Sequence, residues 1–221
     1  MNTEQFIEAK FGFKPSTMRR FMSRLRGLDH VVRWNFYGRI KDQTVAAHTG
    51  WVCIFAHLLL TIEENWHGVD TARRAFIMSS AVAHDMEEAI TGDGPFLLKK
   101  HIGHHTWDAA VFAGLMELHE GVPDGIRQKL IRWCVEAKDG EWGKFVKAAD
   151  LFDVLKYAQD EAHMGNGRAF SRIGKEAIYL IRKLELPAAD ILLCAMGVGD
   201  EPGVPVTDNI SHLGEDGACH P

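Results

Sequence analysis

The sequence predicts an all-α protein, and three observations support this fold class. Apolar residues recur at three- and four-residue spacing along most of the 221-residue chain, which is the period of a helix with one buried face. Alternating runs of valine or isoleucine bounded by turn residues, the pattern of half-buried strands, are hard to find. Capping residues and glycines separate the periodic segments. We therefore expect a helical bundle.

Eight helices are expected, covering roughly residues 16–27, 44–66, 71–91, 105–120, 123–138, 142–164, 171–184 and 187–195. Ser16, Asp70 and Ser171 stand at the starts of the first, third and seventh, where a side-chain oxygen can cap free backbone amides. Gly68 and Gly121 follow the second and fourth, where glycine commonly ends a helix. The second contains the longest apolar run, WVCIFAHLLLTI, which by itself is too short to cross a bilayer.

The length suits one domain with a sizeable core, which we place at residues 1–196. The remaining segment, 197–221, is crowded with glycine, proline and acidic residues and lacks helical periodicity. We expect it to be a mobile tail or a surface extension.

Composition restricts the partners and the compartment. The formal charge of -5 and the pI near 6.2 provide no basic field for duplex nucleic acid. The four cysteines, Cys53, Cys134, Cys194 and Cys219, form no CxxC pair, so neither a zinc ribbon nor a disulfide framework is expected. The polar N-terminus MNTEQFIEAK does not resemble a signal peptide. We expect a cytoplasmic protein that does not enter a membrane.

The pair His84-Asp85 ends the apolar run AFIMSSAVAHD. Burying a carboxylate and an imidazole is costly unless they are paired or bind a metal, so either a satisfied core pair or a metal site is indicated. Helices of a bundle could bring His48 and Asp150 to the same place. Two imidazoles and two carboxylates suit Mn, Fe, Co, Ni or Zn better than calcium and leave coordination positions open.

Four segments together resemble the HD-domain phosphohydrolases, and within them the 5′-deoxynucleotidases. They are RW at 33–34, VAAH ending at His48, HDMEEAITGDGPFLLK over 84–99, and VKAAD ending at Asp150. They occur in the family's order, and the chain is also similar to viral HD-domain dATP triphosphohydrolases. The resemblance implies an HD-domain helical bundle with a metal site in its core.

The resemblance also implies roles for individual residues. The metal ligands would be His48, His84, Asp85 and Asp150. Glu88 would orient or deprotonate the attacking water, and Asp93 would be a second acid that transfers a proton or holds the water network. Without the resemblance, Glu88 could be a solvated helix carboxylate and Asp93 a turn residue, since Gly-Asp-Gly-Pro is strong turn chemistry.

Substrate contacts are implied for Arg33, Trp34 and Lys99, as a phosphate contact, a wall of the nucleotide pocket and the family lysine. Lys100 extends this cationic region, together with the histidines His101, His104 and His105. The cluster could be a solvated helix end, a second metal site or a rim that faces phosphate. We favour the rim.

This sequence departs from the family's usual pattern at two places. Ala47 precedes His48 where a glutamate is usual, which puts in question the support of the ligands and the choice of substrate, but not metal binding. Gly94 and Phe96 in the TGDGP loop suggest a narrower base pocket.

The function expected from these features is metal-dependent removal of the 5′-phosphate group or groups from a 2′-deoxynucleotide, with a purine such as dATP or dAMP favoured. Monophosphate and triphosphate substrates stay equally open. One divalent transition metal is expected, with a second ion such as Mg for a triphosphate, and a homo-oligomer is expected. The alternatives are a non-catalytic HD-like sensor of nucleotide or metal, and a helical interaction module whose histidine and aspartates are merely paired.

Overall fold

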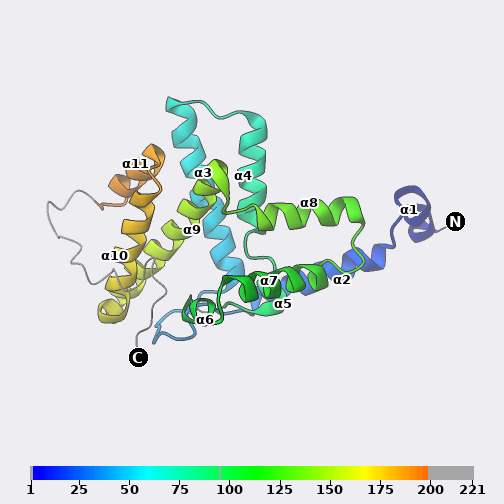
Figure 1. The fold of residues 1–221 in the computed structure, drawn as a ribbon, viewed down its shortest axis with the longest axis horizontal. Helices are drawn as coiled ribbons and strands as arrows, with labels where there is room; N and C mark the ends of the chain where they lie inside the picture. Colours follow the sequence, from blue (N-terminus) through cyan, green and yellow to red (C-terminus); the bar gives the residue numbers. More distant parts are fainter. Residues whose placement is uncertain (1, 95, 199–221) are drawn as a thin grey trace.

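The computed structural model describes residues 2–94 and 96–198, which fold as a helical bundle (Figure 1). Within these residues no strand is present, and two residues, Val32 and Thr44, form an isolated bridge. The all-α prediction is confirmed. The helices are α1 (Thr3–Phe11), α2 (Pro15–Leu25), the 3-10 turn η1 (Arg26–Asp29), α3 (Val45–Trp66), α4 (Thr71–Ala83), α5 (Glu88–Thr91), α6 (Phe96–Ile102), α7 (His104–Leu118), α8 (Asp124–Val135), α9 (Gly140–Glu161), the π-helical turn η2 (Ala162–Asn166), α10 (Gly167–Lys183) and α11 (Pro187–Ala195).

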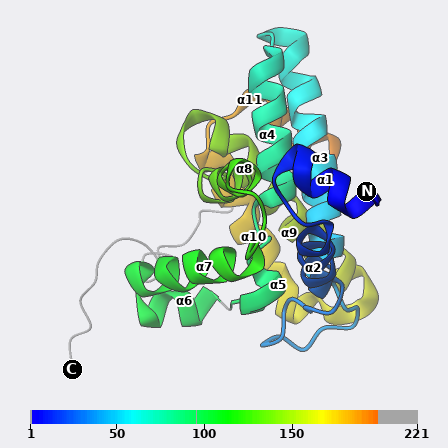
Figure 2. The same cartoon turned by 90° about the vertical axis from the view of Figure 1, so that its right-hand side faces the viewer.

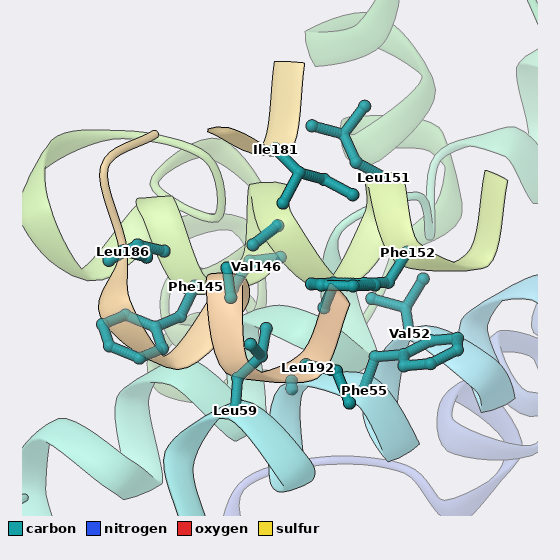
Figure 3. Packing of buried hydrophobic residues seen from close by; sticks show 14 of the residues in the cluster. Val52, Phe55, Leu59, Phe145, Val146, Leu151, Phe152, Ile181, Leu186 and Leu192 are labelled. Atoms are coloured by element: carbon teal, nitrogen blue, oxygen red, sulfur yellow. The ribbon is translucent and has the colours of Figure 1, made fainter. Parts of the chain in front are cut away.

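The main core forms where α3 and α9 pack against each other, with α4, α10 and α11 around them. Figure 3 shows Phe55 of α3 beside Phe152 of α9, and their rings stack with centroids 5.6 Å apart. Both rings are buried, as are Leu59 and Phe145. Burial of these side chains fixes α3 against α9, the two helices that carry His48 and Asp150.

A second buried cluster joins α2, α5, α7 and α8 below the main core. Phe21, Met86, Leu115 and Leu118 are its largest buried members. Figure 2 shows α3 and α4 side by side, with α5 and α7 beneath them. This cluster therefore supports the segment that follows α4, which carries the His84-Asp85 pair.

The prediction of one continuous helix over 71–91 is wrong. Helix α4 ends at Ala83, and after a tight turn the four-residue helix α5 begins at Glu88. In the turn, the Met86 amide donates to the Ala83 carbonyl and the Glu88 amide to the Asp85 carbonyl, which is the i to i+3 pattern of tighter turns. The apolar periodicity continues through this turn, so the break has no signal in the pattern.

Other helix ends differ in smaller ways. Asp70 caps α4 as expected, with its side chain accepting from the Arg73 amide at 2.8 Å. Ser16 and Ser171 do not cap helices, because α2 begins at Pro15 and α10 at Gly167. Helices α1 and α6 were not expected. Of the tail expected over 197–221, residues 199–221 lie outside the described part of the chain, so its mobility remains a prediction.

Helix α3 is 22 residues long and apolar enough to cross a membrane by length and composition. The short apolar run inside it therefore does not exclude a membrane span, contrary to our expectation. In the bundle, Val52, Ala56 and Leu60 on one face of α3 are fully buried, as in the central helix of a helical core.

The loop over residues 30–44 is held against α9 by polar contacts. The buried Glu161 carboxylate accepts from the Ile40 amide at 2.9 Å, the Lys41 amide at 2.8 Å and Asn166 Nδ2 at 2.7 Å. The Tyr157 hydroxyl donates to the Lys41 carbonyl at 2.5 Å. These bonds satisfy backbone groups that have no helical partner and place the loop beside the start of α3.

We predict that Phe152→Ala lowers the free energy of unfolding by about 3–5 kcal/mol, because it removes a fully buried ring and leaves a cavity between α3 and α9. Urea denaturation followed by circular dichroism measures the change. Phe36, which is 77% exposed, provides the matched control, and Phe36→Ala should change stability by less than about 1 kcal/mol. Equal losses in both variants would contradict the assigned core.

We predict that Glu161→Gln costs about 2–3 kcal/mol of stability, because the amide turns an N–H group toward backbone donors that the carboxylate now satisfies. Thermal unfolding of both proteins tests this. Glu141, an exposed glutamate in the first turn of α9, is the control position, and Glu141→Gln should leave the melting temperature nearly unchanged. A wild-type melting temperature in Glu161→Gln would show that the loop is not anchored there.

Candidate functional site

His48 lies in the first turn of α3 and is fully buried. Its Nδ1 is 2.6 Å from Asp153 Oδ2, a carboxylate oxygen that can only accept, so Nδ1 carries a proton. In the neutral ring, Nε2 then presents its lone pair on the opposite side. It faces His84 Nε2 at 3.2 Å, and Asp85 Oδ2 and Asp150 Oδ1 at 3.4 Å each.

His84 and Asp85 reach the same point from the turn after α4. His84 Nδ1 donates to the Ala81 carbonyl at 2.8 Å, which leaves His84 Nε2 as the ring's free lone pair. That nitrogen lies 3.0 Å from Asp85 Oδ2. The helix break is therefore what allows two adjacent residues to direct ligand atoms to one place.

Asp150 completes the group from α9, so the structure brings together all four residues expected to be ligands. Ligand atoms of His48, His84 and Asp150 lie within 4.8 Å of one another and could hold a metal ion. Neighbouring ligand atoms around a metal bound at about 2.1 Å are separated by about 3 Å, and the 3.0–3.4 Å spacings here agree with that. The donors fit a divalent transition metal.

Lysine 138, from the turn between α8 and α9, binds both carboxylates. Lys138 Nζ is 3.5 Å from Asp85 Oδ1 and 3.2 Å from Asp150 Oδ2. Burial alone would raise the carboxyl pKa values, but His84 and Lys138 hold the pKa of Asp85 well below its usual range, and Lys138 and His48 lower that of Asp150. Both side chains are therefore charged at neutral pH, as metal ligands must be.

Glu88 lies one turn beyond Asp85, at the start of α5, and is buried. Its Oε2 has no hydrogen-bond partner within the described structure. Burial, together with the charges of Asp85 and Asp93, raises the pKa of Glu88 to about 9, while Lys99 and Arg33 act in the opposite direction. Glu88 thus interacts with the groups expected to bind substrate, and its free oxygen is available to a water or an ion.

Arg33 and Trp34 lie beside the ligands, on the loop before α3. The Arg33 guanidinium is 3.4 Å from Asp153 Oδ2, and its centre is 5.5 Å from the centroid of the Trp34 ring. Trp34 donates to Gln43 Oε1 at 2.9 Å and stacks on Tyr157 with an interplanar angle of 1°. Arg33 is therefore paired with the carboxylate behind His48, and Trp34 forms part of an aromatic wall.

The loop at Gly94 is packed against Trp107 of α7. A Cβ atom added to Gly94 would lie 1.9 Å from the Trp107 ring, so the indole occupies the space that a side chain at this position would need. Lys99 Nζ lies over the same ring, 4.6 Å from its centroid. Trp107 thus holds both the loop that carries Asp93 and the lysine expected to contact phosphate.

Within the described side chains, His101 and His105 do not join the ligand group. His101 and His105 are exposed on α6 and α7. The side chains of Lys100 and His104 lie outside the described part of the structure. Within the described residues, the group that could hold a metal consists of His48, His84 and Asp150 and contains neither His101 nor His105. The structure therefore gives no support to a second metal site at these histidines.

Sequence reasoning missed three partners of the site: Gln43, Lys138 and Asp153. Gln43 Nε2 donates to Asp153 at 2.9 Å, and Asp153 in turn accepts from His48. Asp153 could have been found, since it lies one turn after Asp150 on an apolar helix, where a second buried carboxylate needs partners. Lys138 has no such signal, because its partners are distant in sequence.

Known proteins resemble this chain in sequence and in fold. A family model described as 5′-deoxynucleotidase YfbR-like matches residues 20–196. Two curated 5′-deoxynucleotidases, from Photorhabdus laumondii and Photorhabdus temperata, are 33% and 32% identical to this chain. The matches span 89 and 88 residues, which is 39% of this chain and 44% of each relative. The matched segment is thus less than half the length of those proteins.

Solved structures show the same fold. An HD-domain phosphohydrolase from Listeria innocua has a TM-score of 0.69 at 20% identity, over 89% of this chain and 95% of that one. A protein from Pyrococcus horikoshii has a TM-score of 0.66 at 20% identity, over 82% and 99%. Because the family model covers most of the chain, this protein belongs to the YfbR-like 5′-deoxynucleotidase family.

Proposed function

We propose that this protein hydrolyses the 5′-phosphate ester of 2′-deoxynucleoside monophosphates and needs one divalent transition metal. The observation that carries the proposal is the convergence of His48, His84 and Asp150, with Asp85 in contact with both imidazoles, beside the buried carboxyl of Glu88, which has an unpartnered oxygen. His48, His84, Asp85 and Asp150 would hold the metal. When bound, such an ion supplies Lewis-acid chemistry toward a phosphoryl oxygen and makes water more acidic.

The chain's own residues then have distinct tasks. Glu88 would orient the attacking water through the free Oε2. It would take the proton of that water in its ionised form, which the positive charge of a bound metal would favour over the neutral acid. Asp93, whose charge acts on Glu88, would pass the proton on or hold the water network. Lys99 and Arg33 would offset phosphate charge, and Trp34 would form one wall of the nucleotide pocket.

A single phosphate is favoured because the family model and the curated relatives are described as 5′-deoxynucleotidases. The alternative reaction is cleavage of a deoxynucleoside triphosphate at the α-phosphate, with a second ion such as Mg. A purine base is proposed because the sequence resembles viral HD-domain dATP triphosphohydrolases. The sensor alternative is disfavoured because binding alone does not require a buried carboxyl such as Glu88 next to the ligands.

We predict that the protein releases orthophosphate from dAMP in the presence of Mn²⁺ or Co²⁺, because both ions suit the mixed nitrogen and oxygen ligands. Chelation with EDTA should abolish turnover, and added metal should restore it. A malachite-green assay on dNMPs, with chromatography of dNTP reactions, identifies the phosphate species. Release of tripolyphosphate from dATP, with no orthophosphate released from dNMPs, would overturn the proposal of a monophosphate substrate. Absence of turnover with Mn, Co, Ni, Fe and Zn would overturn the proposal that the protein is an enzyme.

We predict that Glu88→Gln lowers kcat by about 10²–10⁴-fold while metal content stays at the wild-type level, because the amide cannot take a proton from water. Glu87→Gln is the matched control, since the neighbouring Glu87 carboxylate accepts a hydrogen bond from Cys134 Sγ at 3.3 Å. Metal analysis and steady-state kinetics are measured on both. Asp85→Ala should instead lose the metal. Full activity in Glu88→Gln would show that its assigned role is wrong.

A further inference from the structure

We propose that Lys138 is a positioning residue that holds Asp85 and Asp150 in the orientation that a metal ion requires. The proposal rests on the proposed function, because it concerns the same metal site. Neither the spacing of residues nor the resemblance to a family points to Lys138. It emerges from the contacts of its ammonium group.

The contacts divide the oxygens of each carboxylate into two sets. Asp85 Oδ1 faces Lys138 Nζ at 3.5 Å, whereas Asp85 Oδ2 faces His48 Nε2 at 3.4 Å and His84 Nε2 at 3.0 Å. Asp150 Oδ2 faces Lys138 Nζ at 3.2 Å, whereas its Oδ1 faces His48 Nε2 at 3.4 Å. One ammonium therefore holds the outer oxygen of both ligands and leaves the inner oxygens directed at the imidazoles.

The backbone around Lys138 is built to reach this position. Lys138 lies in the short connection between α8 and α9. A Cβ atom added to Gly143 would lie 2.5 Å from the carbonyl carbon of Lys138. Gly143 is buried in the first turn of α9, and Ala137 next to Lys138 is also buried. The connection is thus packed directly on the helix that carries Asp150, with no space for a larger residue at 143.

Holding the carboxylates has a physical benefit for metal binding. Two like charges that share one pocket repel each other, and each carboxylate can rotate, so an unheld pair would lose orientation before the ion arrives. A cation on the outer side offsets the repulsion and selects one oxygen from each group. Groups that orient metal ligands in this way typically contribute about 10–100-fold to metal affinity or activity.

Lys138 could instead act only as a cation that competes with the metal. Its side chain is 37% exposed, so the lysine lies at the rim of the site. Removal of a competitor would strengthen metal binding, whereas removal of a positioning group would weaken it. The sign of the change separates the two roles.

The test compares wild-type protein with Lys138→Met, Lys138→Arg and Lys147→Met, all stripped of metal and titrated with Co²⁺ by calorimetry. Lys147→Met is the matched control. The charge of Lys147 acts on Asp150 and Asp85, but within the described structure Lys147 forms no ion pair with either carboxylate. We expect Lys138→Met to bind Co²⁺ about 10–100-fold more weakly and Lys138→Arg to recover part of the loss. Lys147→Met should bind at least as tightly as wild type.

The visible absorption spectrum of bound Co²⁺ provides a readout that a general loss of stability would not move. We expect altered ligand-field bands in Lys138→Met and wild-type bands in Lys147→Met. Melting of the metal-free proteins checks folding, and Lys138→Gln replaces Lys138→Met, with the same expectation, if the latter does not fold.

Unchanged or tighter Co²⁺ binding by the Lys138 variants, with the wild-type spectrum, would overturn the positioning role. An equal loss in Lys147→Met would also overturn it, since charge alone would then explain the effect. Failure of the proposed function looks different. In that case the wild-type protein itself would bind no Co²⁺, or would bind it equally well after His48→Ala.

Discussion

The structure depends on the balance of charge around one buried imidazole, His48. Three aspartates contact it, and two cations, Arg33 and Lys138, contact those aspartates. The three carboxylates are held by these two cations and by the imidazoles, in a region where unpaired charges are costly. A divalent ion would add positive charge among these carboxylates, so the same residues that make the interior polar also make it a site suited to a cation.

The side chains in this cluster come from three separate parts of the chain. His48 comes from the beginning of α3, Asp150 and Asp153 from α9, and the His84-Asp85 pair from the turn after α4. The aromatic core between α3 and α9 sets the distance between the first two groups, and the second buried cluster supports the turn. Packing far from the ligands therefore determines whether their atoms converge.

The sequence predicted the fold class and the convergence of the expected ligands because both depend on local patterns and on motif spacing. His48, His84, Asp85 and Asp150 were found by residue type, spacing and resemblance, and they do lie together. The break after Ala83 was missed because apolar periodicity runs through the turn. Lys138 was missed because its contacts link positions 53 and 12 residues apart, and no pattern along the chain records such contacts.

The close approach of Trp107 to Gly94 has a consequence for how this family can vary. The indole and a side chain at position 94 would compete for one volume, so the two positions form a complementary pair in which only one can be large. Relatives with a bulky residue at the position of Gly94 should carry a small residue at the position of Trp107. Substitution at position 94 and at position 107 would therefore have to be coordinated, since a change at one of them alone would leave a clash or a void.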